Sequence, residues 1–191
     1  MGMKSVEGLA QAQCRVGAVS SRFAEAASGS GYTPNMSELS YEIERKYLLR
    51  GRPPHSVGAP SVEIDQGYIP GERIRERIRR ARGADGTRYY RTIKMGSGIQ
   101  RIEIEEETTE AFFDAVWPLT VGFRVRKRRY LVSDDGLVWE IDEFLDRPSL
   151  WLAELELAHV DQVVKIPEWL EPFVEGEVTD DPGYTNRALA R

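Results

Sequence analysis

Arginine occupies four alternate positions, 73, 75, 77 and 79, in the stretch Glu72–Arg82, with Ile74 and Ile78 at two of the intervening positions. Successive side chains of a strand point to opposite faces, so these arginines would share one face of a strand. On a helix the same residues would spread around the whole circumference. The stretch is therefore predicted to be a β-strand with one strongly basic face. The fold must expose that face to water or to groups of opposite charge.

The same alternation of charged and apolar residues recurs along most of the chain after residue 40. Turn signals such as Gly83-Ala84-Asp85-Gly86 and Asp134-Asp135-Gly136 separate the alternating stretches. The predicted strands are Tyr41–Arg50, Val62–Ile69, Glu72–Arg82, Thr87–Met95, Ile99–Glu107, Phe123–Ser133, Leu137–Phe144 and Trp151–His159. Eight short strands joined by tight turns indicate an antiparallel barrel or sandwich.

Three helical segments are expected beside these strands. A helix with Thr108 as its N-cap is predicted to end near Trp117, because Pro118 follows and Phe112, Phe113 and Val116 form an apolar stripe. Short helical pieces are expected at Pro167–Phe173 and Asn186–Ala190. The fold class predicted from this pattern is α+β and mainly β, with helices flanking the strands.

Composition excludes several kinds of protein. The chain has 191 residues and a net charge of −5, which argues against a nucleic-acid partner, and no apolar run is long enough to span a membrane. Cys14 is the only cysteine and only His55 and His159 are present, so a disulfide, a thiolate zinc cluster or a histidine metal site is not expected.

Residues 1–37, rich in Ala, Ser and Gly, are expected to be a disordered or weakly helical extension of a domain at 38–191. Met36 is an alternative start, and a cytoplasmic location is expected.

The charges are sorted by sign between strands. The acidic pairs are Glu42/Glu44, Glu103/Glu105, Glu140/Asp142 and Glu154/Glu156, and the basic sets are the four alternate arginines, Lys127/Arg129 and the single residues Lys46 and Lys94. A sandwich with its charged faces in water explains any one strand, and it explains Glu42-Ile43-Glu44-Arg45-Lys46 taken alone, but it does not explain the sorting. A closed barrel with its polar face inward could instead bind a polyanion, with divalent metal ions between phosphate and carboxylate oxygens.

The order of motifs resembles that of the CYTH, or triphosphate tunnel metalloenzyme, family over nearly all of residues 41–190. The motifs are Glu42-x-Glu44-x-Lys46, Gln66-Gly67-Tyr68, Arg75-x-Arg77, Thr92-Ile93-Lys94, Arg101-x-Glu103-x-Glu105, Lys127-x-Arg129-Tyr130, Trp139-Glu140-Ile141-Asp142-Glu143-Phe144, Glu154-x-Glu156 and Glu177-Val178-Thr179 with Tyr184 and Asn186. This resemblance implies an eight-stranded antiparallel closed barrel, a tunnel that binds a triphosphate end-on.

The resemblance also implies roles for individual residues. Metal, as Mg²⁺ or Mn²⁺, would be held by Glu42, Glu44 and Glu156, with Glu154 and Asp142 as helpers or ligands of a second ion. The triphosphate would be bound by Lys46, Arg75, Arg77, Lys94, Arg101, Lys127 and Arg129. Glu42, Glu44, Lys46 and Lys94 are the expected catalytic residues.

The implied reaction is metal-dependent hydrolysis of inorganic tripolyphosphate to pyrophosphate and phosphate. Two alternatives stay open within the family, a class IV type adenylate cyclase and a triphosphatase acting on thiamine or nucleoside triphosphates. A third is a module that binds polyphosphate without cleaving it. The partner is expected to be a small triphosphate, and a homodimer is left open. Arg45, Glu76 and Arg91 are expected on the outer face, and Arg73 and Arg79 either at the tunnel mouth or in solvent.

Overall fold

The structure is a computed structural model that describes residues 41–71, 75–95 and 100–190, without the side chains of residues 41, 42, 95 and 100–102. The predicted extension at 1–37 and Arg73 lie outside the described residues. No helix within the described part is long and apolar enough to cross a membrane.

Nine β-strands dominate the described residues. They are β1 (Tyr41–Leu49), β2 (Ser61–Ile69), β3 (Arg75–Gly83), β4 (Gly86–Met95), β5 (Gln100–Thr108), β6 (Arg124–Asp134), β7 (Leu137–Phe144), β8 (Trp151–Glu156) and β9 (Val174–Glu177). The α-helices are α2 (Glu110–Val116) and α3 (Asn186–Leu189), and the 3₁₀ helices are η2 (Pro54–Ser56), η3 (Trp117–Thr120), η4 (Glu171–Phe173) and η5 (Pro182–Tyr184). The mainly-β prediction is confirmed.

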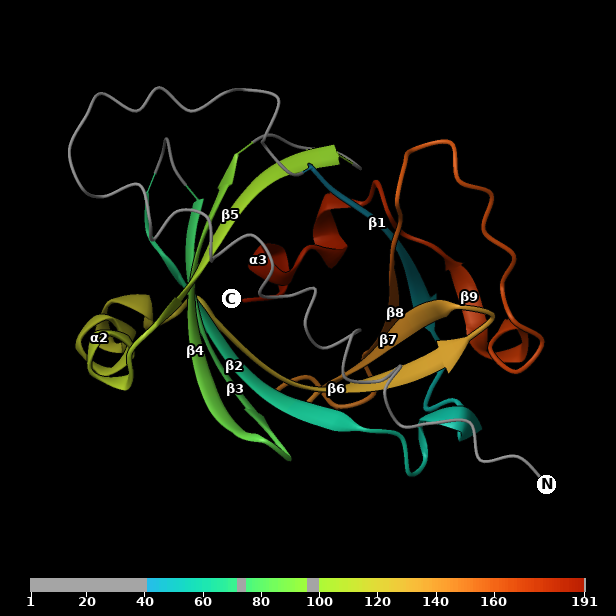
Figure 1. Ribbon diagram of the computed structural model, residues 1–191, viewed down its shortest axis with the longest axis horizontal. Helices are drawn as coiled ribbons and strands as arrows, with labels where there is room; N and C mark the ends of the chain where they lie inside the picture. The colour runs from blue at the N-terminus through green and yellow to red at the C-terminus, as the bar shows by residue number, and fades with distance from the viewer. Residues whose placement is uncertain (1–40, 72–74, 96–99, 191) are drawn as a thin grey trace.

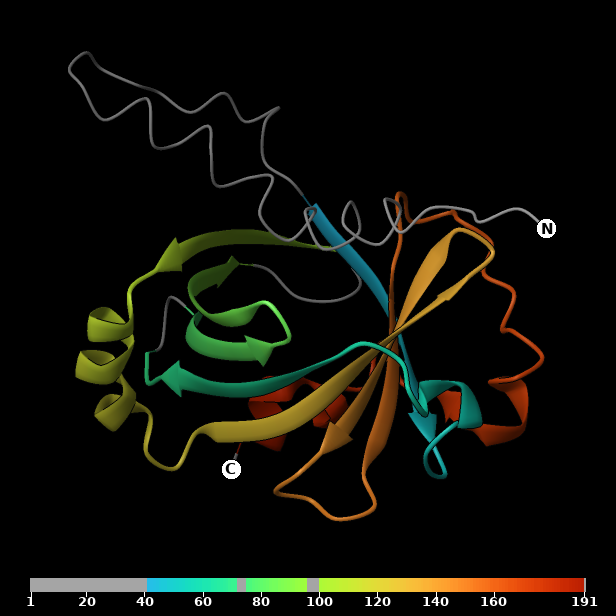
Figure 2. The same cartoon turned by 60° about the horizontal axis from the view of Figure 1, so that its bottom comes forward.

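All strands belong to one curved antiparallel sheet, in the order β5-β4-β3-β2-β6-β7-β8-β1-β9, and α3 lies on its concave side (Figures 1 and 2). In addition, β1 pairs with β5 at Tyr41↔Ile102, Glu42↔Arg101 and Ile43↔Gln100. The sheet thus has nine strands where eight were predicted. Closure of the eight longer strands into a barrel stays a prediction.

The ninth strand forms because β5 leaves part of one edge of β1 without a hydrogen-bonding partner. One edge pairs with β8 from Glu44 to Leu49, and the other pairs with β5 only near its start. Backbone groups on the rest of that edge still need partners, and β9 supplies them from Tyr47 to Leu49. In the range Pro167–Phe173, where short helical pieces were expected, the structure has the 3₁₀ helix η4, and the chain then extends into β9.

The apolar core lies mainly on the convex face of β1, β6, β7 and β8. Its central side chains include Tyr47, Trp139, Ile141 and Leu155, each at most 3% exposed. The segment from residue 157 to 174 covers this face and contributes Leu170. Since the apolar faces of these strands are buried on the convex side, their charged faces must turn to the concave side.

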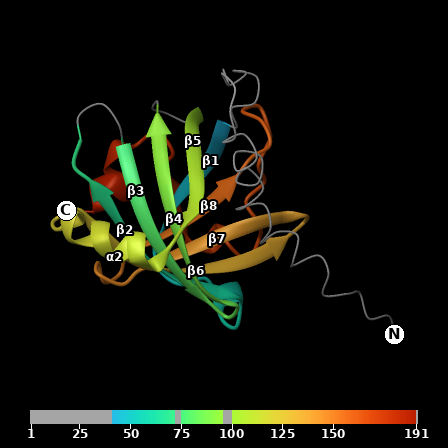
Figure 3. The same cartoon turned by 60° about the vertical axis from the view of Figure 1, so that its left-hand side comes forward.

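Helix α2 lies across the outside of β3 and β4 (Figure 3). Thr109, rather than the predicted Thr108, caps it by accepting a 3.1 Å hydrogen bond from the backbone N–H of Phe112. Phe113 is buried under the helix and contacts the ring of Tyr89. The following turn, η3, packs against β2 so closely that a Cβ at Gly67 would lie 2.4 Å from Thr120 Oγ1.

Candidate active site

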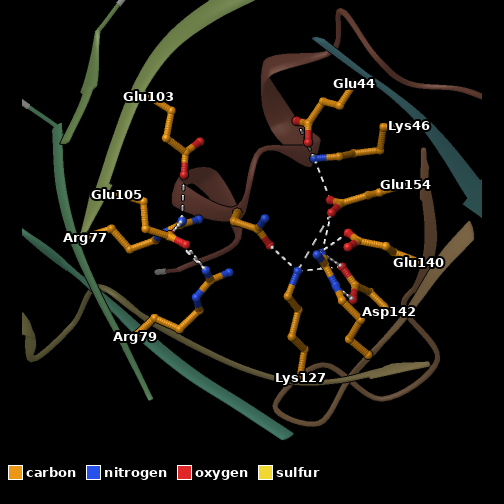
Figure 4. A network of polar contacts seen from close by, with 12 residues as sticks. Glu44, Lys46, Arg77, Arg79, Glu103, Glu105, Lys127, Glu140, Asp142 and Glu154 are labelled. Atoms are coloured by element: carbon orange, nitrogen blue, oxygen red, sulfur yellow. Dashed lines mark hydrogen bonds and ion pairs between the residues drawn. The ribbon is translucent and has the colours of Figure 1, made fainter. Parts of the chain in front are cut away.

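Two clusters of charged side chains face each other across the concave side of the sheet (Figure 4). We call them the first and the second cluster. The first cluster contains Lys46, Lys127 and Arg129 with Glu44, Glu140, Asp142 and Glu154. The second cluster contains Arg77, Arg79 and Lys94 with Thr92, Glu103 and Glu105.

Strand register assembles the first cluster around β1 and β8. Lys46 lies opposite Glu154, and Glu44 lies opposite Glu156, so the four side chains share one face. The ammonium of Lys46 is 2.8 Å from Glu154 and 3.6 Å from Glu44. Burial lowers the pKa of Lys46, but Glu154 and Glu44 outweigh it, so its pKa lies above the ordinary value.

A second part of this cluster joins β6 to β7. Arg129 donates from Nε and Nη2 to the two oxygens of Asp142, each at 2.7 Å, which is the bidentate geometry that an arginine fork favours. Lys127 Nζ is 2.5 Å from Asp142, and both residues are at most 2% exposed. Burial lowers the pKa of Lys127, and the neighbouring Arg129 lowers it further.

Glu140 and Glu154 lie opposite each other on β7 and β8, and both contact Arg129. Burial raises the pKa of Glu140 to about 7, against the opposing effect of Arg129. Burial also acts to raise the pKa of Glu154, but Lys46, Lys127 and Arg129 hold it well below the ordinary value. Glu140 therefore binds a proton more readily than its neighbour Glu154, because three cations surround Glu154.

The second cluster is built on β3, β4 and β5. Arg77 reaches Glu103 and Glu105, each at 3.0 Å, and Arg79 reaches Glu105 at 2.8 Å. Thr92 donates a 2.8 Å hydrogen bond to Glu105. Burial raises the pKa of Glu105, yet the two arginines bring it below the ordinary value. Lys94 completes the cluster at 2.5 Å from Glu103.

The structure brings most of the predicted site residues to this concave face. Arg75 lies opposite Lys94 and half-buried, and Glu156 is exposed opposite Glu44. The backbones of Glu42 and Arg101 pair with each other, but their side chains lie outside the described residues. Arg79 belongs to the second cluster, whereas Arg91 is on the outer face with Glu76.

Sequence reasoning named Thr92 and Asn186 in the motifs of the family resemblance but gave neither residue a role in the site. Thr92 shares its face with Lys94 by period-two spacing, and this parity could have identified it. Asn186, from α3, accepts from Lys127 Nζ at 3.5 Å, and no strand pattern could reveal that contact. His55 and His159 are exposed.

The donor set fits a hard divalent cation in its chemistry, because carboxylate oxygens are the ligands that Mg²⁺ and Mn²⁺ prefer. Among the described residues, no group of three His, Cys, Asp or Glu side chains is gathered in a metal-binding geometry. Asp142 and Glu154 instead contact lysine and arginine side chains. Glu44 and Glu156 lie opposite each other on β1 and β8, beside the ion pair of Lys46 and Glu154.

A curved antiparallel sheet that carries facing clusters of Arg, Lys and carboxylates defines the CYTH, or triphosphate tunnel, class of protein. No family model matches the chain. It is 39% identical over 155 residues to an inorganic triphosphatase of Nitrosomonas europaea, covering 78% of this chain and 96% of that protein. It is 33% identical over 159 residues to an inorganic triphosphatase of Acetivibrio thermocellus, covering 80% and 95%.

A solved structure of the inorganic triphosphatase NE1496 superposes with a TM-score of 0.55 at 33% identity, covering 84% of this chain and 97% of that one. The chain belongs to the inorganic triphosphatase family of CYTH proteins.

Proposed function

We propose that this protein hydrolyses inorganic tripolyphosphate to pyrophosphate and phosphate. The observation that carries the proposal is the convergence of six cationic side chains on one face, from strands far apart in sequence, namely Lys46, Arg77, Arg79, Lys94, Lys127 and Arg129. Such a concentration of lysine and arginine suits a compact anion with several charges. Two relatives that this chain covers almost completely, both named inorganic triphosphatases, support the same substrate.

We further propose that the strands β1 to β8 close into a tunnel around this substrate. The pairing of β1 with β5, which joins the two distant parts of the sheet, supports closure. Enclosure matters chemically because contacts between opposite charges strengthen when water is excluded. A tripolyphosphate between the first and second clusters would be in reach of cations from both sides.

Mg²⁺ or Mn²⁺ would be held by Glu44 and Glu156 together with Glu42, with Glu154 and Asp142 nearby. When bound, the metal would neutralise phosphate charge and make a coordinated water more acidic. The contacts of Asp142 with Lys127 and Arg129 support a role in orienting these cations rather than in direct ligation.

The protein's own cations would then perform most of the catalysis. Lys46 and Lys94 lie in opposite clusters and would stabilise the charge that develops on phosphate oxygens. Arg77 and Arg129, together with Lys127, Arg75 and Arg101, would orient the chain of phosphates. Carboxylates such as Glu105 and Glu154 would hold these cations in place before the substrate arrives, which reduces the reorganisation needed on binding.

The test is an assay of tripolyphosphate, ATP and thiamine triphosphate with Mg²⁺ or Mn²⁺, with all products separated. We expect pyrophosphate and phosphate from tripolyphosphate as the main products. Cyclic AMP from ATP as the main product would instead make the protein a cyclase. Tight binding of tripolyphosphate without turnover under either metal would make it a binding module. A cytoplasmic location and the state of oligomerisation stay predictions.

A further inference from the structure

The C-terminal helix α3 lies inside the curve of the sheet rather than on its outside (Figure 1). Leu189 and Ala190 are buried, at 9% and 0% exposed, against Val125, Phe144 and Leu152. A helix of only four residues has little stability of its own. Its position therefore depends on this apolar packing and on side chains that bind its ends.

Arg147, in the loop between β7 and β8, holds the C-terminal end of α3. Its Nε and Nη2 both donate to the backbone oxygen of Leu189, at 2.9 and 2.5 Å. Carbonyl groups in the last turn of a helix have no partner within the helix, so this two-pronged contact satisfies one of them. At the other end, the Thr185 side chain accepts from the backbone N–H of Ala188.

Asn186 then links α3 to the first cluster. Its side-chain oxygen accepts from Lys127 Nζ at 3.5 Å, while Asp142 accepts from the same nitrogen at 2.5 Å. The Lys127 side chain also lies 5.8 Å from the centre of the Phe144 ring, which packs in the same apolar cluster as Leu189. Asn186 supplies an acceptor without adding a negative charge, so it can restrain the ammonium without repelling a phosphate.

We propose that α3 is a positioning element for the triphosphate site, in which Arg147 fixes the helix and Asn186 fixes Lys127. Neither residue would touch the substrate. Each acts through another group, Arg147 through the backbone of Leu189 and Asn186 through Lys127. The inference rests on the proposed function, because it concerns the orientation of Lys127, one of the proposed phosphate-binding residues.

The experiment compares Asn186→Ala, Arg147→Ala and the double variant with the unchanged protein, using tripolyphosphate and saturating Mg²⁺. We expect each single variant to raise KM about tenfold and to change kcat much less. A tenfold rise is the size of effect that a hydrogen bond to a charged group typically contributes. The double variant should show no more than the larger single effect, because both changes disturb the same contact. Arg147→Lys, which keeps the positive charge but only one donor nitrogen, should give a KM between those of Arg147→Ala and the unchanged protein.

Arg187→Ala is the matched control, since Arg187 is an exposed residue of the same short helix. We expect it to leave both constants unchanged. A lower kcat with unaltered KM in the Ala variants would mean that less of the protein is folded, and it would overturn the proposal. Additive effects of the two substitutions would also overturn it. If the unchanged protein does not hydrolyse tripolyphosphate, the proposed function is wrong. The KM and kcat of the variants relative to the unchanged protein test only the role of α3.

Discussion

Lys46 on β1 and Glu154 on β8 lie directly opposite each other, with the lysine ammonium 2.8 Å from the carboxylate. Two residues nearer the start of β1, Glu44 lies opposite Glu156. One pair of adjacent strands thus presents an ion pair next to two carboxylates that face each other. This arrangement places a proposed phosphate contact beside a proposed metal site.

Replacing Glu44 with Gln should lower metal-dependent turnover of tripolyphosphate by at least about 100-fold, because a neutral amide is a far weaker ligand for a hard cation. The measurement is kcat together with the melting temperature, which should stay near that of the unchanged protein. Glu76→Gln makes the same chemical change on the outer face of β3 and should be neutral for turnover. Full activity in Glu44→Gln would contradict its assignment to the site.

Removing divalent metal with a chelator should abolish turnover, and Mg²⁺ or Mn²⁺ should restore it. Added metal should also raise the melting temperature, because a ligand that binds only the folded state stabilises it. Glu44→Gln should lose most of that rise. Equal thermal shifts in the two proteins would show that the ion binds elsewhere.

Replacing Asp142 with Asn should lower the free energy of unfolding by about 3–5 kcal/mol, because it leaves Lys127 and Arg129 without their buried counter-charge. Denaturant unfolding followed by tryptophan fluorescence measures this change. Glu177→Gln is a suitable comparison, since Glu177 and Arg45 form a more exposed pair 3.7 Å apart. Its effect should be about 1 kcal/mol or less. Similar losses in both variants would argue that burial does not govern the difference.

Replacing Gly67 with Ala should destabilise the protein by about 1–3 kcal/mol, the usual effect of forcing extra volume into a packed site. A new Cβ would lie 2.4 Å from Thr120 Oγ1, and Thr120 is fully buried. Gly176→Ala provides the control, because no atom lies within 4 Å of the corresponding Cβ position. The melting temperature of Gly67→Ala should therefore be lower than that of Gly176→Ala. Equal melting temperatures would mean that η3 does not pack closely against β2.

Asp65 should make stability depend on pH in the acid range. Burial raises the pKa of Asp65, but Arg80, Arg82 and Arg126 lower it below the ordinary value, so the folded state favours the ionised form. The resulting stability is present above the unfolded pKa of about 4 and is lost as the pH falls through the lower folded pKa. The difference in unfolding free energy between the unchanged protein and Asp65→Asn should therefore be largest near pH 7 and shrink in acid. A difference that grows in acid would contradict this.

Sequence periodicity located most of the sheet, because alternation is a property of each strand by itself. It missed β9 at Val174–Glu177, where pairing with the edge of β1, rather than any local pattern, produces the strand. It also extended the last predicted strand to His159, whereas β8 ends at Glu156. Both errors arise where a partner strand, and not the segment's own residues, decides the conformation.

The sequence alone determined which residues alternate, which strands carry acid and which carry base, and so which side chains could form one polar face. Only the tertiary structure decided which of them meet. Lys46 finds Glu154 because the register of β1 against β8 is fixed by hydrogen bonding and burial along the whole sheet. Asn186 reaches Lys127 because the burial of Leu189 and Ala190 places α3 on the concave side. Periodicity is local, but register and docking depend on the energy of the entire fold.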